Sequence, residues 1–153
     1  MSCARVMIAL AACALLTAGP SEAQQHTMPE NARVYIIWPP DGAVISGGFW
    51  VRMGLAEAGV APAGVVRNNT GHHHLLIDVD LPKLDEPIPN DRHHLHFGLG
   101  QTETMLDLPP GTHTLQLLMG DADHVPHDPP VMSRRITITV RPGRQSAPVA
   151  STQ

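Results

Sequence analysis

Histidine is the residue type whose number and spacing stand out in this chain of 153 residues. The ten histidines equal the combined number of lysines and arginines, and nine of them lie between positions 72 and 127. They fall into three groups, at 72–74, 93–96 and 124–127, with His113 standing apart. Neutral imidazole is the commonest metal ligand in proteins, and it also titrates near neutral pH. The pattern therefore favours metal binding, with a pH-responsive surface as the alternative.

The first two groups contain the spacing His-x-His. Residues i and i+2 of a strand share one face and lie about 6.6 Å apart, at about 3.3 Å per residue. Two imidazoles at that separation can converge on one metal ion, about 2.0–2.1 Å from each nitrogen. Six histidines are the candidate ligands, and two more are secondary candidates: His72, His74, His94, His96, His124 and His127, followed by His73 and His113.

The secondary candidates also have a structural interpretation. His73 shares a strand face with Leu75, and His113 shares one with Leu115, so both can be hydrogen-bonded core histidines. His93 follows an arginine and is interpreted as a solvated loop residue.

Acidic residues close to the histidines in sequence can support them. Carboxylates commonly accept the second ring N–H of a metal-bound imidazole and fix its orientation. Asp121, Asp123 and Glu103 are the candidates for this role, although the aspartates can equally be turn formers.

Cysteine usage narrows the choice of metal. The only two cysteines are Cys3 and Cys13, both in the N-terminal apolar region, so the remaining chain offers no thiolate. Imidazole sites suit copper and zinc, and Cu(II) stands highest in the affinity order of the divalent ions. We therefore expect copper first and zinc second.

The N-terminus predicts export. A short segment containing Arg5 precedes an apolar run that is too short to span a bilayer, and small residues at positions 21 and 23 suit cleavage after Ala23. Residues 1–23 are thus the expected signal peptide, which makes the protein periplasmic or secreted. Leu-Ala-Ala-Cys ending at Cys13 offers an alternative, a lipid anchor on that cysteine. No later segment is long and apolar enough to be a transmembrane helix.

The elements that must position the histidines are strands. Fifteen prolines, thirteen glycines and short alternating segments predict an all-β fold, an immunoglobulin-like antiparallel β-sandwich of about seven strands. The expected strands are 33–38, 43–46, 49–55, 72–79, 102–108, 112–119 and 131–140. They divide the chain into a polar lead-in at 24–32, the histidine-rich domain at 33–140 and a flexible tail at 141–153. In this topology the three histidine groups meet at one end, and His113 lies at the other.

Several function classes find no support. The net charge of −4 and the aromatic content of 3% argue against a nucleic-acid partner. The sequence contains neither a Gly-x-Ser-x-Gly nucleophile elbow nor a glycine-rich phosphate loop.

Four sequence blocks carry a family resemblance: Gly71-His-His-His-Leu-Leu-Ile-Asp78, His94-Leu-His-Phe-Gly98 with Gln101-Thr-Glu-Thr104, Pro109-Pro-Gly-Thr-His-Thr-Leu-Gln-Leu-Leu118, and His124-Val-Pro-His-Asp-Pro-Pro-Val131. From about Val34 to Val140 the chain resembles the bacterial family named domain of unknown function 4399. The resemblance implies an exported single-domain protein. It also implies that the secondary candidate His113 is a family-type position and that His93 is not.

Together these features predict a periplasmic metal-binding protein that buffers or delivers copper, then zinc. Its expected partners are the metal ion and another periplasmic protein. The alternatives are a metal-dependent enzyme with an open histidine-ligated position, served by Asp121 or Glu103 as acid or base, and a pH-responsive interaction module.

Overall fold

A computed structural model describes residues 27–143 of the chain. The expected signal peptide, Cys13 and most of the C-terminal tail lie outside the described residues. Within residues 27–143, no helix has the length and apolar character needed to cross a membrane.

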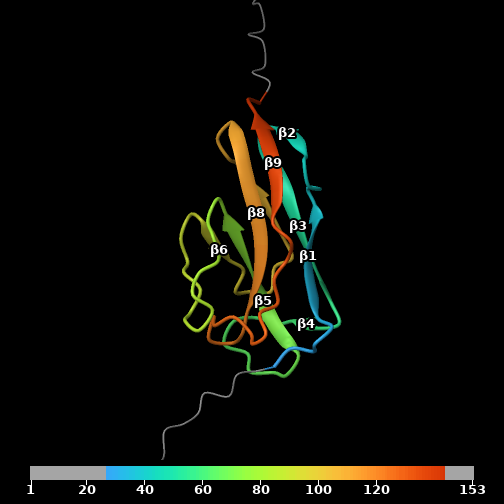
Figure 1. Cartoon of the computed structure of the whole chain (residues 1–153), viewed down its shortest axis with the longest axis vertical. Coiled ribbons are helices and arrows are strands. Elements are labelled where there is room, and N and C mark those ends of the chain that lie inside the picture. The colour runs from blue at the N-terminus through green and yellow to red at the C-terminus, as the bar shows by residue number, and fades with distance from the viewer. Residues whose placement is uncertain (1–26, 144–153) are drawn as a thin grey trace, which may run out of the picture.

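Within residues 27–143, nine strands form two sheets that pack face to face (Figure 1). In chain order they are β1 (Arg33–Trp38), β2 (Val44–Ser46), β3 (Phe49–Ala56), β4 (Gly59–Val60), β5 (Thr70–Ile77), β6 (His94–His96), β7 (Glu103–Leu106), β8 (Gly111–Gly120) and β9 (Ile136–Arg141). One sheet has the order β1-β3-β7. The other has the order β2-β9-β8-β5-β4, and β6 pairs with β5 beside this path. The fold is therefore an all-β, immunoglobulin-like sandwich.

Alternation of apolar and polar residues directs one face of each outer strand into the core. In β3, Phe49, Val51 and Met53 are buried while Trp50 and Arg52 are exposed. The same period of two governs β9, where the residues at 136, 138 and 140 are buried.

The two central strands are buried on both faces. Every residue of β5 from Gly71 to Ile77 is buried, and so is β8 from Leu115 to Gly120. The inner face packs on the three-stranded sheet. On the outer face, Leu76 and Leu118 form a second apolar cluster with Ile88, which lies in the connection after β5. This outer cover buries side chains that would otherwise face water.

Three elements differ from the sequence-based expectation. The two-residue strand β4 and the three-residue strand β6 were not among the expected strands, because each is too short to show a period of its own. The last strand begins at Ile136 rather than at Val131, because the residues before Ile136 do not pair regularly with β8. Met132 makes only an isolated bridge with Leu118. The Leu117 N–H donates to the side-chain hydroxyl of Ser133, at 2.8 Å, instead of to a backbone carbonyl.

Candidate metal centre

Strand β5 places alternate histidines on opposite faces of the six-stranded sheet. His72 and His74 share the outer face with Leu76, whereas His73 faces the interior of the sandwich with Leu75 and Ile77. All three histidines are fully buried. The strand therefore delivers two imidazoles, not three, to one location.

Strand β6 brings a third imidazole to the same face. In the antiparallel pairing of β5 with β6, His96 lies directly opposite His74. The two ring centroids are 5.1 Å apart and the rings are stacked, with an interplanar angle of 29°. The register of a three-residue strand thus decides that His96 joins the site.

A fourth imidazole, that of His124, comes from the loop between β8 and β9. The carboxylate Oδ1 of Asp121 accepts the backbone N–H groups of Asp123 and Val125, both at 2.9 Å. The carbonyl of Asp121 accepts the N–H of His124 at 3.1 Å, and the carbonyl of His124 accepts the N–H of Ile88 at 2.9 Å. These bonds hold the His124 backbone at φ +70° and turn its ring toward the sheet.

The four rings form one compact cluster. Ring centroids lie 4.9 Å apart for His72–His74, 5.0 Å for His72–His96, 5.1 Å for His72–His124 and 4.7 Å for His96–His124. The widest pair is His74–His124, at 6.2 Å. We call His72, His74, His96 and His124 the four-histidine cluster.

The nitrogen atoms of the cluster lie at distances that suit a shared ion. His72 Nε2 and His74 Nε2 are 3.0 Å apart, and ligand atoms of His72, His74 and His96 all lie within 4.8 Å of one another. Two nitrogens bound to one metal at about 2.1 Å, with an angle of about 90–110° between them, are about 3.0–3.4 Å apart. The observed pair matches the lower end of that range.

Burial favours the neutral, metal-binding form of three histidines of the cluster, those at positions 72, 74 and 96. Burial, reinforced by the neighbouring His96 and His124, lowers the pKa of His72 to about 4. Burial and then His72 lower the pKa of His74 to about 3. The pKa of His96 is also lowered, by burial and then by His124. Three buried ring nitrogens of the cluster, Nδ1 of His72, Nδ1 of His74 and Nε2 of His96, have no hydrogen-bond partner among residues 27–143.

Glycines make the space that the rings occupy. A Cβ on Gly98 would lie 2.5 Å from His96 Nε2, and closer still to its Cε1. A Cβ on Gly120 would lie 2.9 Å from His74 Nε2. The sequence analysis did not identify either glycine as part of the site. Their only sequence signal is that each lies close to a strand that carries histidines.

His94 and His127 do not join the cluster of ring contacts, although both were candidate ligands. His94 pairs with Leu76 rather than with a histidine, and its Nδ1 donates to Asp91 Oδ1 at 3.0 Å. His127 is buried beside Gly71, where its Nε2 would be 2.7 Å from a Cβ on that glycine.

His113 lies at the opposite end of β8, in agreement with the topological expectation. Its Nδ1 donates to Asp78 Oδ2 at 2.6 Å, and its Nε2 donates to the carbonyl of Pro109 at 2.8 Å. Burial acts to lower its pKa, but the bond to Asp78, aided by the Pro109 carbonyl, raises the pKa overall. Because both partners of the ring can only accept, this geometry favours the doubly protonated form of His113.

Of the three acidic residues expected to orient the histidines, only Asp121 contacts the loop that carries a cluster histidine. Asp121 shapes the His124 loop, and its negative charge acts to raise the pKa of His72. Asp123 is exposed in that loop. Glu103 lies on β7 in the other sheet, where it pairs with Arg52 at 3.3 Å, so it does not support the histidines.

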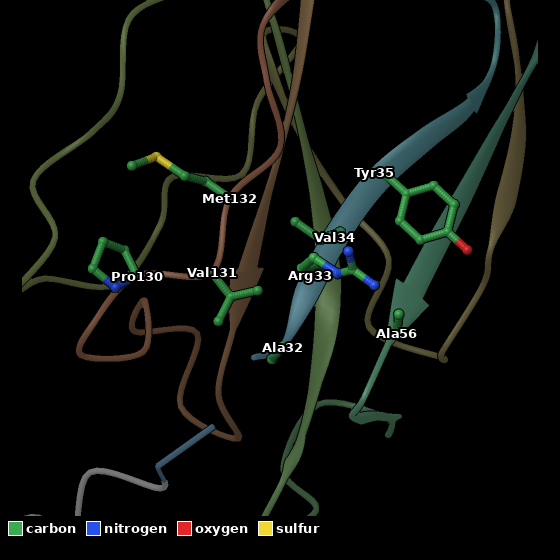
Figure 2. Close-up of a pocket in the computed structure, with 8 residues that line it drawn as sticks. All are labelled: Ala32, Arg33, Val34, Tyr35, Ala56, Pro130, Val131 and Met132. Atoms are coloured by element: carbon green, nitrogen blue, oxygen red, sulfur yellow. The ribbon is translucent and has the colours of Figure 1, made fainter. Parts of the chain in front are cut away.

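An open groove of about 490 Å³ lies away from the cluster, at the free edge of β1. It is lined by residues 32–35, Ala56 and residues 130–132 (Figure 2). Arg33 is its only charged residue, so the groove offers no set of ligands or catalytic acids.

Fold and site together define an immunoglobulin-like β-sandwich with a buried histidine cluster on the outer face of its larger sheet. The chain belongs to the family described as domain of unknown function DUF4399, whose model matches residues 51–141. That match confirms the resemblance drawn from the sequence blocks.

Solved structures that are similar to this chain include the following two. The fibronectin(III)-like modules of Clostridium thermocellum CbhA match with 13% identity and a TM-score of 0.39, over 72% of this chain and 99% of theirs. The PKD domain of human KIAA0319 matches with 12% identity and a TM-score of 0.39, over 88% of this chain and 100% of its own. No curated protein matches the chain significantly.

Proposed function

We propose that this protein is an exported metal-binding protein and that the four-histidine cluster holds the ion. One observation carries the proposal. Four imidazoles from three separate segments bring their rings within 4.7–6.2 Å of one another, and the facing Nε2 atoms of His72 and His74 have the separation of two ligands of one ion. Burying several polar rings together is costly unless a partner satisfies them, so a shared ion is the natural explanation of the cluster.

The donor set favours copper, then zinc. All four side chains offer imidazole nitrogen, and the depressed pKa values of His72 and His74 keep these two deprotonated at neutral pH. Nitrogen donors without thiolate suit Cu(II) and Zn(II), with Cu(II) the tighter binder.

The surroundings of the cluster favour buffering or delivery of the metal over catalysis by the metal. The enzyme hypothesis relied on Asp121 or Glu103 as an acid or base. Oδ1 of Asp121 holds two loop amides, and Glu103 pairs with Arg52 in the other sheet. A pH-responsive surface is also less well supported, because the pKa values of about 4 and about 3 lie far below neutrality.

The test is a titration of the protein without its first 23 residues, with Cu(II) and Zn(II) separately, followed by metal content and thermal unfolding. A ligand that binds only the folded state stabilises it by RT ln(1 + [L]/Kd), about 2.7 kcal/mol at one hundred times Kd. We expect saturation at one equivalent and loss of the shift in the double variant His72→Ala/His74→Ala.

The matched control is His93→Ala. It removes a histidine whose Nδ1 donates to the carbonyl of Ile77 at 3.0 Å, outside the cluster. This variant should bind metal as the unchanged protein does. Equal binding by the folded double variant would overturn the assignment of the site, and no shift with either ion would overturn the function.

A further inference from the structure

The outer face of the three-stranded sheet exposes every tryptophan and tyrosine of the chain. The sequence has two tryptophans and one tyrosine. Trp38 and Tyr35 are each 46% exposed and Trp50 is 44% exposed, together with Ile37 and Met105. Figure 2 shows the Tyr35 ring pointing away from Val131. We call Tyr35, Ile37, Trp38, Trp50 and Met105 the aromatic face.

Strand register makes these side chains one continuous patch. Trp50 lies opposite Met105 on β7, and Trp38 lies opposite Arg52 on β3. Side chains directly opposite each other on neighbouring strands have their Cβ atoms about 4.5–5.5 Å apart. The Tyr35 ring covers Gly54, its partner across β1 and β3, where a Cβ would meet the Tyr35 hydroxyl oxygen at 2.8 Å.

A break in the register of β1 turns Trp38 outward. Val34 is buried and Ile36 is half-buried on the inner side, so strict alternation would send Trp38 inward as well. The register with β3 shifts between Ile36 and Trp38, and as a result both Ile37 and Trp38 are exposed. Irregularities of this kind commonly re-aim a side chain. The fold thus exposes a tryptophan that regular pairing would bury.

We propose that the aromatic face docks on the same face of a second copy of this chain. Charge is the first argument. At the centre of the face, Arg52 Nε pairs with Glu103 Oε2 at 3.3 Å. Because that arginine is already balanced, the centre of the patch has no unpaired charge to attract an oppositely charged partner, and a second identical face is compatible with it.

Area is the second argument. Aromatic side chains offer about 150–250 Å² each, so five large side chains about half exposed present roughly 500 Å² of apolar surface. A standard interface buries about 800 Å² per partner, of which about 56–65% is apolar. The aromatic face supplies the apolar share of one such interface. Flat sheet faces pack about 10 Å apart, and this pairing leaves both four-histidine clusters on the outer sides of the dimer.

Analytical ultracentrifugation of the protein lacking residues 1–23, over a dilution series, tests the proposal. Tryptophan emission is recorded in parallel, because both tryptophans lie on the face. We expect a dimer that dissociates on dilution, with a red shift as the rings become hydrated. Trp50→Lys and, on the neighbouring strand, Met105→Lys should each give a monomer. The matched control Leu99→Lys, at a loop residue that is 82% exposed, should remain dimeric.

Either of two results would overturn the proposal. One is a monomer at all concentrations up to about 100 µM, which would mean that any self-association is weaker than micromolar. The other is a dimer that persists in folded Trp50→Lys and Met105→Lys. In the monomer case, a change of tryptophan emission on adding a soluble polysaccharide would assign the face to glycan binding.

Discussion

Replacing Gly98 by alanine should move one imidazole of the cluster without deleting any histidine. The new Cβ would lie 2.5 Å from His96 Nε2, closer than non-bonded atoms approach, so the tip of the ring must move. The Gly98 backbone is outside the left-handed region, and alanine can therefore adopt it. His96 is only half-buried, so we expect the displaced ring to move toward solvent.

We expect Gly98→Ala to remove one of the four histidine ligands of the ion, His96. Disturbing even the groups that orient a metal ligand lowers affinity about 10–100-fold. We therefore expect Gly98→Ala to weaken Cu(II) binding at least that much, or about 1.4–2.8 kcal/mol. Stability of the metal-free protein should change by no more than about 1 kcal/mol, because the displaced ring reaches solvent.

Competition against a chelator of known affinity measures the first quantity, and urea unfolding measures the second. Gly48→Ala is the matched control, because its Cβ meets only ordinary contacts, at 3.4 Å from the Leu106 carbonyl oxygen and 3.8 Å from Met105 Sδ. Native copper affinity in Gly98→Ala would show that His96 does not hold the ion, and the cluster argument would then fail at that residue.

Two further predictions concern pH and the opposite end of the sandwich. Burial lowers the pKa of His72 to about 4 and that of His74 to about 3, so the unfolded chain takes up protons at a higher pH than the folded chain does. The metal-free protein should therefore lose stability as the pH falls from 6.5 toward 4. The loss should reach up to about 1.4 kcal/mol per pH unit for each histidine. Urea unfolding across that range checks this, and a flat profile would contradict it. Asp78→Asn should cost about 1–3 kcal/mol below pH 6.5, because it weakens a bond to a charged histidine, while copper affinity stays unchanged. The pKa of His113 is raised, so this deficit should shrink as pH rises through the folded-state pKa, and a deficit that is constant with pH would refute the role of the charge.

Strands with a clear period of two could be predicted from the sequence, and short or irregular ones could not. The expected segment 33–38 coincides with β1, because β-branched and aromatic residues fill it and two prolines follow it. The expected segment 49–55 nearly coincides with β3, because it alternates along its length. Three residues at 94–96 carry too little pattern to reveal β6, although their pairing with β5 decides which histidine enters the cluster. Nor can alternation anticipate the register shift in β1 that turns Trp38 outward.

The candidate site was predictable as a set of residue types but not as a geometry. The spacing His-x-His does put two side chains on one face, as His72 and His74 show. The same spacing at His94 and His96 leaves only His96 within the cluster, because cross-strand register and the hydrogen bond to Asp91 draw His94 aside. The position of His124 depends on loop hydrogen bonds around Asp121 and on the amide of Ile88, which no local pattern specifies.

The neighbouring positions argue that these histidines are not there to stabilise the fold. Leu76 occupies the next outward site of β5 and is packed against Leu118, so this face accepts aliphatic side chains. His72 and His74 fill the preceding outward sites, fully buried, and the Nδ1 of each has no hydrogen-bond partner among residues 27–143. Each unsatisfied buried group costs about 1–3 kcal/mol, which leucine at the same place would avoid. A metal ion held by the facing Nε2 atoms of these rings would offset that cost, so the same residues that weaken the metal-free sandwich are the ones that would make its stability respond to copper.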